Sequence, residues 1–168
     1  MRKVISLLFV LLLLSACGYT PSAKFARSVL SDKISTSVVV SALDPENTVI
    51  IKDAVDRAII EVFQASLVSR SESDTHLTLT MGNPGYSPIE YDQNGFVIGY
   101  RMSIVLGIKS SRNGVIKNYS ARGFHDFSVA PNSIVTDQDR FEAISFSTQR
   151  AIKAFLAQVS ADGARTTK

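Results

Sequence analysis

An apolar residue at every second position from Phe96 to Ile108 constrains the fold more than any other feature of the sequence. Arg101 and Lys109 fall on the opposite side of this run, and this period of two is typical of a β-strand with one face in the core. Turn signals flank the run, Asn94-Gly95 before it and Arg112-Asn113-Gly114 after it, and both favour hairpins. We therefore expect a central strand with antiparallel neighbours and one covered face.

Three further segments have the character of strands. Ser35 to Ala42 is rich in valine, which favours a short strand buried on at least one face. Residues 76–81 alternate between apolar and polar and predict a second strand, after which residues 86–91 can resume an extended path. Val115 to Val129 predicts a strand after the central one, in a register that its pattern does not assign.

Two amphipathic helices are predicted. Asp44-Pro45-Glu46 is a helix start, and apolar residues at three- and four-residue spacing then predict a helix that ends near Ser69. Thr136 and Asp139 resemble a capping box at the start of a second helix. The polar chain from Asp162 is predicted to fray.

The first seventeen residues form an export signal. Met1-Arg2-Lys3 precedes an apolar run from Val4 to Leu14, which is shorter than the roughly 20 residues that a membrane-spanning helix needs. Leu14-Ser15-Ala16-Cys17 resembles the lipobox of bacterial lipoproteins, in which the cysteine is diacylated and becomes the new N-terminus. The alternative is a plain secretory signal with a chance cysteine. Gly18 follows Cys17 where many inner-membrane lipoproteins carry an aspartate, which predicts the periplasmic face of the outer membrane.

Together these features predict an α+β fold in the order β-α-β-β-β-α, with two helices packed on one face of a four-stranded sheet. The predicted organisation is a signal peptide at residues 1–16, a lipid-anchored tether at 17–33 with a short ordered piece around Phe25 to Leu30, a single α+β domain at 34–161 and a flexible tail at 162–168.

The charge balance argues against nucleic acid as a partner. The formal net charge is +3, and without the signal, which holds Arg2 and Lys3 and no acid, it is +1. A nearly neutral domain can attract an anionic partner only through a local cluster of cations.

Residue types for catalysis are scarce. His76 and His125 are the only histidines, both lie in predicted strands, and we interpret both as structural. Once Cys17 is acylated, no thiol remains for nucleophilic chemistry or zinc. The sequence therefore predicts a protein that is not an enzyme, with no metal site and no cofactor beyond the covalent lipid on Cys17.

Cations gather on and beside the central strand. They can be ordinary solvated or edge-protecting side chains, or they can contact the phosphate or carboxylate groups of a glycolipid. The candidates for lipopolysaccharide contact are Arg101, Lys109, Arg112, Lys117 and Arg122.

Leu14-Ser15-Ala16-Cys17-Gly18-Tyr19, followed by the valine strand, the long helix, the three-strand meander and the C-terminal helix, resembles the LptE family of lipopolysaccharide-assembly lipoproteins. The resemblance implies a non-enzymatic partner inside an LptD-type β-barrel that helps the barrel fold and helps lipopolysaccharide reach the cell surface. On this hypothesis the hairpin tips at Gln93 to Gly95 and Arg112 to Gly114 project toward the barrel or the lipid.

Two alternatives remain open. The first is an accessory lipoprotein of another envelope transport or secretion machine, which co-purification with a large β-barrel would distinguish. The second is an envelope hydrolase, which a deep cleft holding a buried acid, or His76 beside a nucleophile, would favour.

Overall fold

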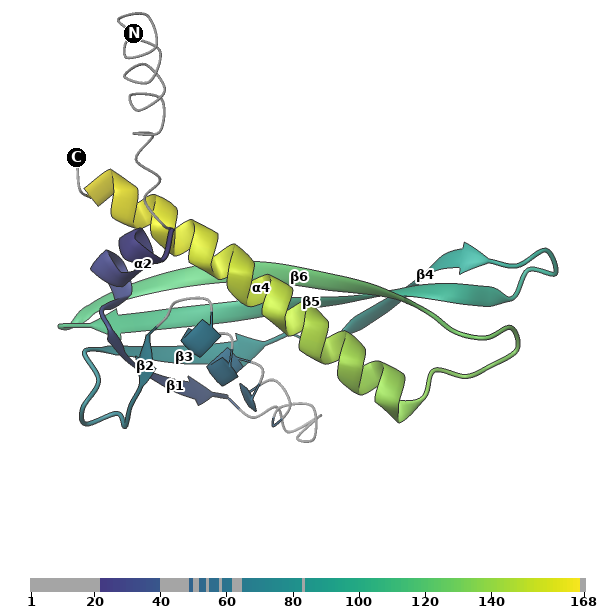
Figure 1. Cartoon of the computed structure of the whole chain (residues 1–168), viewed down its shortest axis with the longest axis horizontal. Helices are drawn as coiled ribbons and strands as arrows, with labels where there is room; N and C mark the ends of the chain where they lie inside the picture. Colours follow the sequence, from purple (N-terminus) through teal and green to yellow (C-terminus); the bar gives the residue numbers. More distant parts are fainter. Residues whose placement is uncertain are drawn as a thin grey trace, which may run out of the picture.

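The computed structural model describes residues 22–39, 49, 52–53, 55–57, 59–61, 65–82 and 84–166. The predicted signal peptide, the predicted lipidation site at Cys17 and the predicted helix start at residues 44–46 lie outside these residues. None of the described helices is both long and apolar enough to cross a membrane. The elements with complete bounds are α2 (Ser22–Leu30), β1 (Lys33–Val38), β2 (Ser66–Leu67), β3 (Thr75–Met81), β4 (Gly85–Tyr91), β5 (Val97–Arg112), β6 (Val115–Ser128) and α4 (Asp137–Thr166) (Figure 1).

The 16-residue strand β5 organises the sheet. One edge of β5 pairs with β6 along almost its whole length, from Gly99 opposite Ser128 to Arg112 opposite Val115. Its other edge is shared between β3, which pairs with residues 106–112, and β4, which pairs with residues 97–103. Strand β1 continues the sheet beyond β3 in parallel, and β2 pairs in parallel with β1.

The prediction of a four-stranded sheet with two helices on one face is wrong. The sheet is mixed and curled, has six strands, and carries one long C-terminal helix. All seven residues of β4 are exposed, so no buried alternation marks that strand in the sequence. The first predicted helix does not reach Ser69, because Ser66 and Leu67 form β2; its described residues between 49 and 61 are helical.

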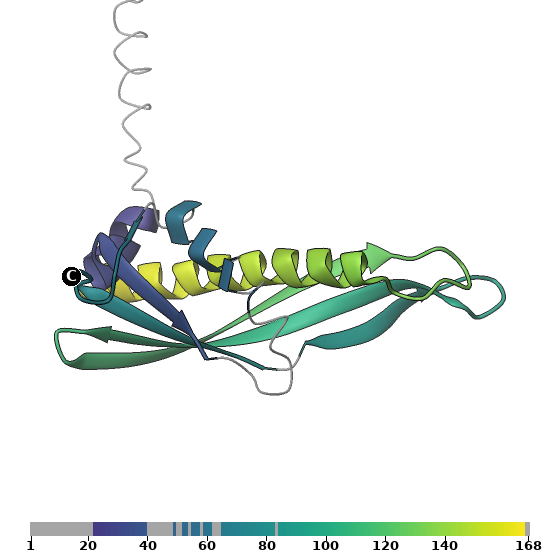
Figure 2. The same cartoon turned by 90° about the horizontal axis from the view of Figure 1, so that it is seen from below.

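The core lies between the sheet and α4, which runs along one face (Figure 2). Alternation in β5 places four side chains, at positions 102, 104, 106 and 108, fully or almost fully inside, as the sequence predicts. The apolar stripe of α4 meets them, and Phe155 is the largest fully buried side chain. The capping box at the start of α4 is also confirmed, since the Thr136 amide donates to Asp139 and the Asp139 amide donates to the Thr136 hydroxyl.

Both ends of the predicted domain are longer than expected. Helix α2 occupies the predicted ordered piece of the tether, and its Ala26 and Leu30 are fully buried. Helix α4 continues to Thr166 where a flexible tail is predicted, because Gly163 lets it approach α2 closely. A Cβ at Gly163 would overlap the carbonyl oxygen of Phe25. The contact between α2 and α4 therefore orders segments that look polar and unstructured in the sequence.

Helix α4 and the sheet approach each other closely at Gly123 of β6. A Cβ there would overlap the carbonyl oxygen of Ser147 and lie 2.6 Å from the amide nitrogen of Ala151. Side chains of α4 also cover the free edge of β6: Arg150 donates to the carbonyl of Phe124 and Gln158 to that of Ser120. Strand β6 is thus an edge strand whose unpaired carbonyls are partly satisfied by the helix.

Gly123→Ala is expected to lower the free energy of unfolding by about 2 kcal/mol, because the added methyl forces α4 away from the sheet. The matched control is Gly85→Ala in β4, where the nearest atom to the new methyl, the carbonyl oxygen of Ser103, is 4.0 Å away. Urea denaturation of both variants measures the difference. Equal transition midpoints would contradict the tight helix–sheet contact.

Candidate functional site

The β5–β6 register places three of the five predicted cations on the open face of the sheet, away from α4. Arg101 and Lys109 occupy odd positions of β5, opposite in direction to the buried even positions. Arg122 of β6 pairs with Val105, midway between them. Successive cations are therefore four residues apart, about 13 Å along the strands. They form a row and not a cluster.

Arg101 already has a partner. Its Nε and Nη2 each donate to one carboxylate oxygen of Asp126, both at 2.7 Å, and its guanidinium lies 4.7 Å from the centre of the Phe124 ring. These hydrogen bonds raise the pKa of Arg101 and lower the pKa of Asp126. Because this bidentate pair occupies two of its N–H donors and neutralises its charge, Arg101 is less available to an external anion than the other cations of the row.

Lys109 borders a shallow hollow in the open face. Because Gly107 lacks a side chain, the Thr80 hydroxyl lies over it, and the hollow of about 290 Å³ beside them has a mostly apolar lining with a few hydroxyl, amide and ammonium groups at its border. Neither Lys109 nor Arg122 makes an ion pair or side-chain hydrogen bond within the described ranges. This arrangement can accept a sugar hydroxyl or a phosphate oxygen. The lining residues are Thr78, Thr80, Gly107, Ile108, Lys109, Asn118 and Tyr119.

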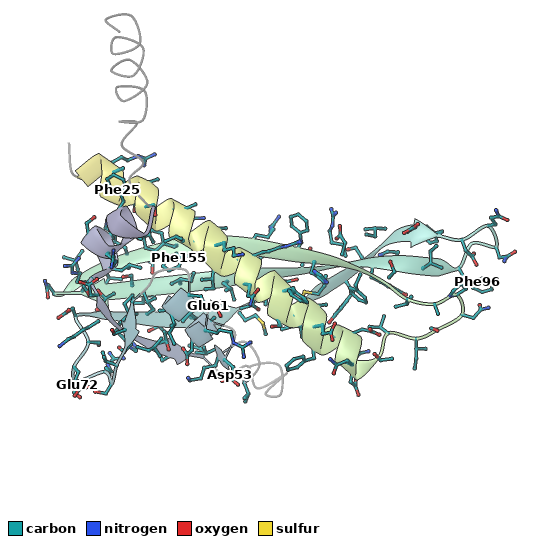
Figure 3. The ribbon with its side chains drawn as sticks, viewed as in Figure 1. Phe25, Asp53, Glu61, Glu72, Phe96 and Phe155 are labelled. Carbon is teal, nitrogen blue, oxygen red and sulfur yellow. The ribbon has the colours of Figure 1, made fainter. Side chains whose placement is uncertain are left out.

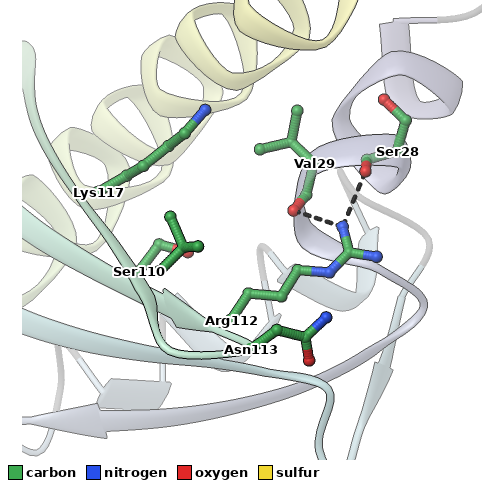
Figure 4. Close-up of a pocket in the computed structure, with 7 residues that line it drawn as sticks. Ser28, Val29, Ser110, Arg112, Asn113 and Lys117 are labelled. Atoms are coloured by element: carbon green, nitrogen blue, oxygen red, sulfur yellow. Dashed lines mark hydrogen bonds between the residues drawn. The ribbon is translucent and has the colours of Figure 1, made fainter. Parts of the chain in front are cut away.

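Arg112 lies on the other face and has a structural role. Its Nη1 donates to the carbonyl oxygens of Ser28 at 2.8 Å and Val29 at 2.7 Å, in the last turn of α2 (Figure 4). A cation at this position satisfies carbonyls that the helix leaves unpaired and complements the negative end of the helix dipole. Arg112 therefore fastens α2 to the end of β5.

Lys117 stands across a second hollow, between α2 and the β5–β6 hairpin (Figure 4). This hollow of about 300 Å³ has Val29 and Val115 as apolar walls. The ammonium of Lys117 lies 3.8 Å from the carboxylate of Asp162 on α4, which also accepts a hydrogen bond from the Tyr119 hydroxyl. Burial, together with that bond, raises the pKa of Tyr119 to about 12. Lys117 and Arg112 are thus separate from the row on the open face.

The two hairpin tips, which the LptE resemblance implies project toward the barrel or the lipid, lie at opposite ends of the molecule (Figure 1). Residues 93–95 precede β5 and residues 112–114 follow most of it, and a 16-residue strand is about 50 Å long. The two tips cannot contact one small ligand together.

The residues around Gly107 are not among the candidates predicted from the sequence. Thr78 and Thr80 lie on the polar side of β3, and Asn118 faces Lys109 across the β5–β6 pair. The only signal in the sequence is the glycine itself, which interrupts the polar face of an otherwise regular strand. Their convergence depends on the registers of β3 and β6 relative to β5, which the sequence does not reveal.

His76 lies between two serines of β1. Its Nδ1 is 2.7 Å from the Ser35 hydroxyl and its Nε2 is 3.0 Å from the Ser37 hydroxyl, and Ser35 also bonds Ser73 at 2.7 Å. Burial, and then the charge of Arg70, lower the pKa of His76. The imidazole is therefore neutral at pH 7 and links the parallel strands β1 and β3. No described group of three histidine, cysteine or acidic side chains could hold a metal ion.

His125 faces α4, where its ring stacks on Phe146 at 4.8 Å between ring centres. Burial is the main cause that lowers the pKa of His125, followed by the charge of Arg150. Both histidines thus occupy structural positions in the described part of the chain, as the sequence suggests.

Arg112→Ala is expected to lower the free energy of unfolding by about 1–2 kcal/mol, because two helix carbonyls lose a charged donor. Lys109→Ala, on the same strand but without a partner, is the control and should change it by less than about 0.5 kcal/mol. Urea denaturation compares them. Equal effects would show that Arg112 does not fasten α2.

Acidification is expected to destabilise the fold through the two histidines. The pKa values of both histidines in the folded state lie below the usual histidine value of 6.5. The unfolded chain therefore binds protons first as the pH falls, and the fold loses stability from about that pH down to the lowered pKa. The urea midpoint should therefore drop between about pH 7.5 and 5.5, and drop less in the His76→Gln/His125→Gln variant. An equal drop in both proteins would assign the pH dependence to other groups.

No family model matches this chain, and no curated protein matches it in sequence. Solved structures share its architecture. The solution structure of the uncharacterised lipoprotein B from Nitrosomonas europaea has a TM-score of 0.52 at 11% identity, over 79% of this chain and 84% of that one. A crystal structure of a Xanthomonas campestris protein of family DUF330 has a TM-score of 0.50 at 11% identity, over 81% of this chain and 87% of that one. At such identities the similarity shows the fold alone: this chain has a fold that occurs in bacterial lipoproteins.

Proposed function

We propose that this chain is a lipid-anchored lipoprotein on the periplasmic face of the outer membrane that assists assembly of an LptD-type β-barrel and delivery of lipopolysaccharide to the outer leaflet. The observation that carries the proposal is the lipobox ending at Cys17, placed before a domain with a fold that occurs in bacterial lipoproteins. Several acyl chains on one cysteine would anchor the chain stably, because each buried CH₂ contributes about 0.8 kcal/mol.

The shape of the domain suits a place inside a barrel. A 16-residue strand and a 30-residue helix of about 45 Å make a rod, with one face covered by the helix and one open. The open face carries polar side chains such as Ser103, Lys109 and Asn118 beside the exposed rings and alkyl groups of Phe124 and Ile116. The lumen of an outer-membrane barrel is polar and wet, so the cations of this face could stay solvated there.

The open face also supports contact with lipopolysaccharide. Lys109 and Arg122 are exposed and unpaired among the described residues, and Lys109 borders the hollow at Gly107, whose lining is mostly apolar with a few hydroxyl and amide groups. Charge-assisted hydrogen bonds from cations to phosphate are stronger than neutral ones. Of the five predicted contacts, Lys109 and Arg122 are therefore the ones we retain for direct binding, whereas Arg101 and Arg112 are engaged with Asp126 and α2.

A hydrolase is the second candidate, because the Ser35 hydroxyl lies 2.7 Å from His76 Nδ1. We favour a structural role for this pair. His76 is only 9% exposed and the second serine occupies its other ring nitrogen, so neither nitrogen is free to exchange a proton with a substrate. A fluorophosphonate probe distinguishes the two: labelling that Ser35→Ala abolishes would establish a serine hydrolase and refute the non-enzymatic proposal.

Lys109→Glu/Arg122→Glu is expected to weaken binding of purified lipopolysaccharide by about tenfold or more, since two cations facing the ligand become anions. The matched control is Lys153→Glu/Arg140→Glu on exposed positions of α4, with the same change in net charge and an expected change in affinity of less than about twofold. Surface plasmon resonance with the acylated chain in detergent measures both. Equal losses in the two variants would mean that net charge, and not the open face, governs binding.

A further inference from the structure

Large apolar side chains are exposed at the end of the molecule opposite α2. Figure 3 shows Phe96 at this end and Phe25 of α2 at the other. The exposed fraction ranges from 37% for Tyr86 to 84% for Ile134. The exposed residues are Tyr86, Ile89, Tyr91, Phe96, Ile134 and Phe141.

Two projections contribute these side chains. One is the β4–β5 hairpin, and the other is the chain between β6 and the first turn of α4 (Figure 1). They join at the base, where Gly99 pairs with Ser128 and the amide of Val129 donates to the carbonyl of Ile98 at 2.9 Å. We call residues 85–98 and 129–142 the distal end.

The distal end is not part of the domain's core. All seven residues of β4 are exposed, and the core cluster contains none of the six apolar residues above. Exposed apolar side chains on a strand at the edge of a sheet favour aggregation, and such patches commonly mark interaction sites. A partner that covers the distal end would remove this liability.

The charge of the distal end indicates which kind of partner fits. Its only base is Arg140, and its five acids give it a formal net charge of −4. An anionic lipid surface or the phosphates of a glycolipid would be repelled, whereas cations on a protein surface would be attracted. The acids are Glu90, Asp92, Asp137, Asp139 and Glu142.

We propose that the distal end docks onto a protein surface that combines apolar residues with exposed arginine or lysine. This inference rests on the proposed function, in which the partner is the β-barrel itself. The distal end, and not the cationic open face, then provides the apolar side chains that hold the complex together. Aromatic side chains such as Tyr91 and Phe96 are the type that commonly dominates the binding energy of protein interfaces. Lipid and protein would then contact different parts of the rod.

The first test is affinity purification of the acylated full-length chain from detergent-solubilised outer membrane. The variant Tyr91→Ser/Phe96→Ser/Ile134→Ser is expected to co-purify with about one tenth, or less, of the β-barrel that wild type retains. The matched control, Val115→Ser/Ile116→Ser, removes side chains that are 60% and 53% exposed at the opposite end and should retain the barrel fully. Urea midpoints of the distal variant and wild type should agree, because none of the three side chains is in the core.

The outcomes separate the two proposals. If wild type retains no barrel, the proposed function fails and this docking assignment fails with it. If wild type and the distal variant retain the barrel equally, the proposed function stands and the docking assignment alone is overturned. If the distal variant loses the barrel but is also unfolded, Glu90→Lys/Glu142→Lys replaces it. This variant keeps the apolar surface and should weaken retention of the barrel by charge repulsion. Full retention by this variant overturns the docking assignment.

The second test asks whether the distal end enters a membrane instead. The chain has no tryptophan, so Phe96→Trp introduces a single fluorescent reporter at the tip. The acylated variant is bound to phosphatidylethanolamine–phosphatidylglycerol vesicles with brominated acyl chains. Unquenched emission is expected, because the acids keep the tip away from the anionic surface. Quenching by the brominated chains would make the distal end a membrane wedge and overturn the protein-docking proposal.

Discussion

The close contact between the backbone of α4 and that of β6 at Gly123 is the constraint on which the rest of the structure depends. Without a side chain at this position the helix lies close enough for its Ser147 hydroxyl to reach the Met102 carbonyl of β5. The apolar stripe of α4 then covers the even-numbered side chains of β5, and Gly163 brings the end of the helix onto α2. Because one helix covers one face so closely, the opposite face remains open along the rod.

Regular patterns in the sequence predicted the main elements well. The buried alternation is confirmed in β5 from Met102 to Ile108, whereas Phe96 at the start of the run precedes the strand and is exposed; the capping box of Thr136 and Asp139 is confirmed at the start of α4. The elements that were missed or only outlined lack such patterns: β2, which was not predicted, has two residues, and β4, predicted only as an extended path over residues 86–91, is exposed throughout. Long-range contacts also order α2 and the last turns of α4, and composition does not report such contacts.

The candidate site could be predicted only in part, for a reason of register. The open face of β5 follows from counting alone, so Arg101 and Lys109 were placed correctly, and Arg112 at an even position belongs by the same count to the face that α4 and α2 occupy. The partners of these residues lie on other elements. Asp126 neutralises Arg101, and Asn118 lies opposite Lys109. Predicting these two pairs requires the register of β6, and the weak alternation of that strand does not specify it.

Charged and apolar surface groups lie at different positions along the rod-shaped domain. An anchor sequence precedes α2, unpaired cations lie on the open face near the middle, and an acidic, aromatic end lies farthest from α2. In the proposed role, the open face contacts glycolipid and the distal end contacts protein. The proposed role joins these parts: a permanent partner of an outer-membrane barrel.

Depletion of this chain in its own cell, followed by measurement of the folded LptD-type barrel in the outer membrane, tests that role most directly. The amount of barrel in its folded, heat-modifiable form should fall as the chain is depleted. Expression of a second copy of the chain with an intact Cys17 should restore that amount. Unchanged accumulation of the folded barrel in depleted cells would contradict the account.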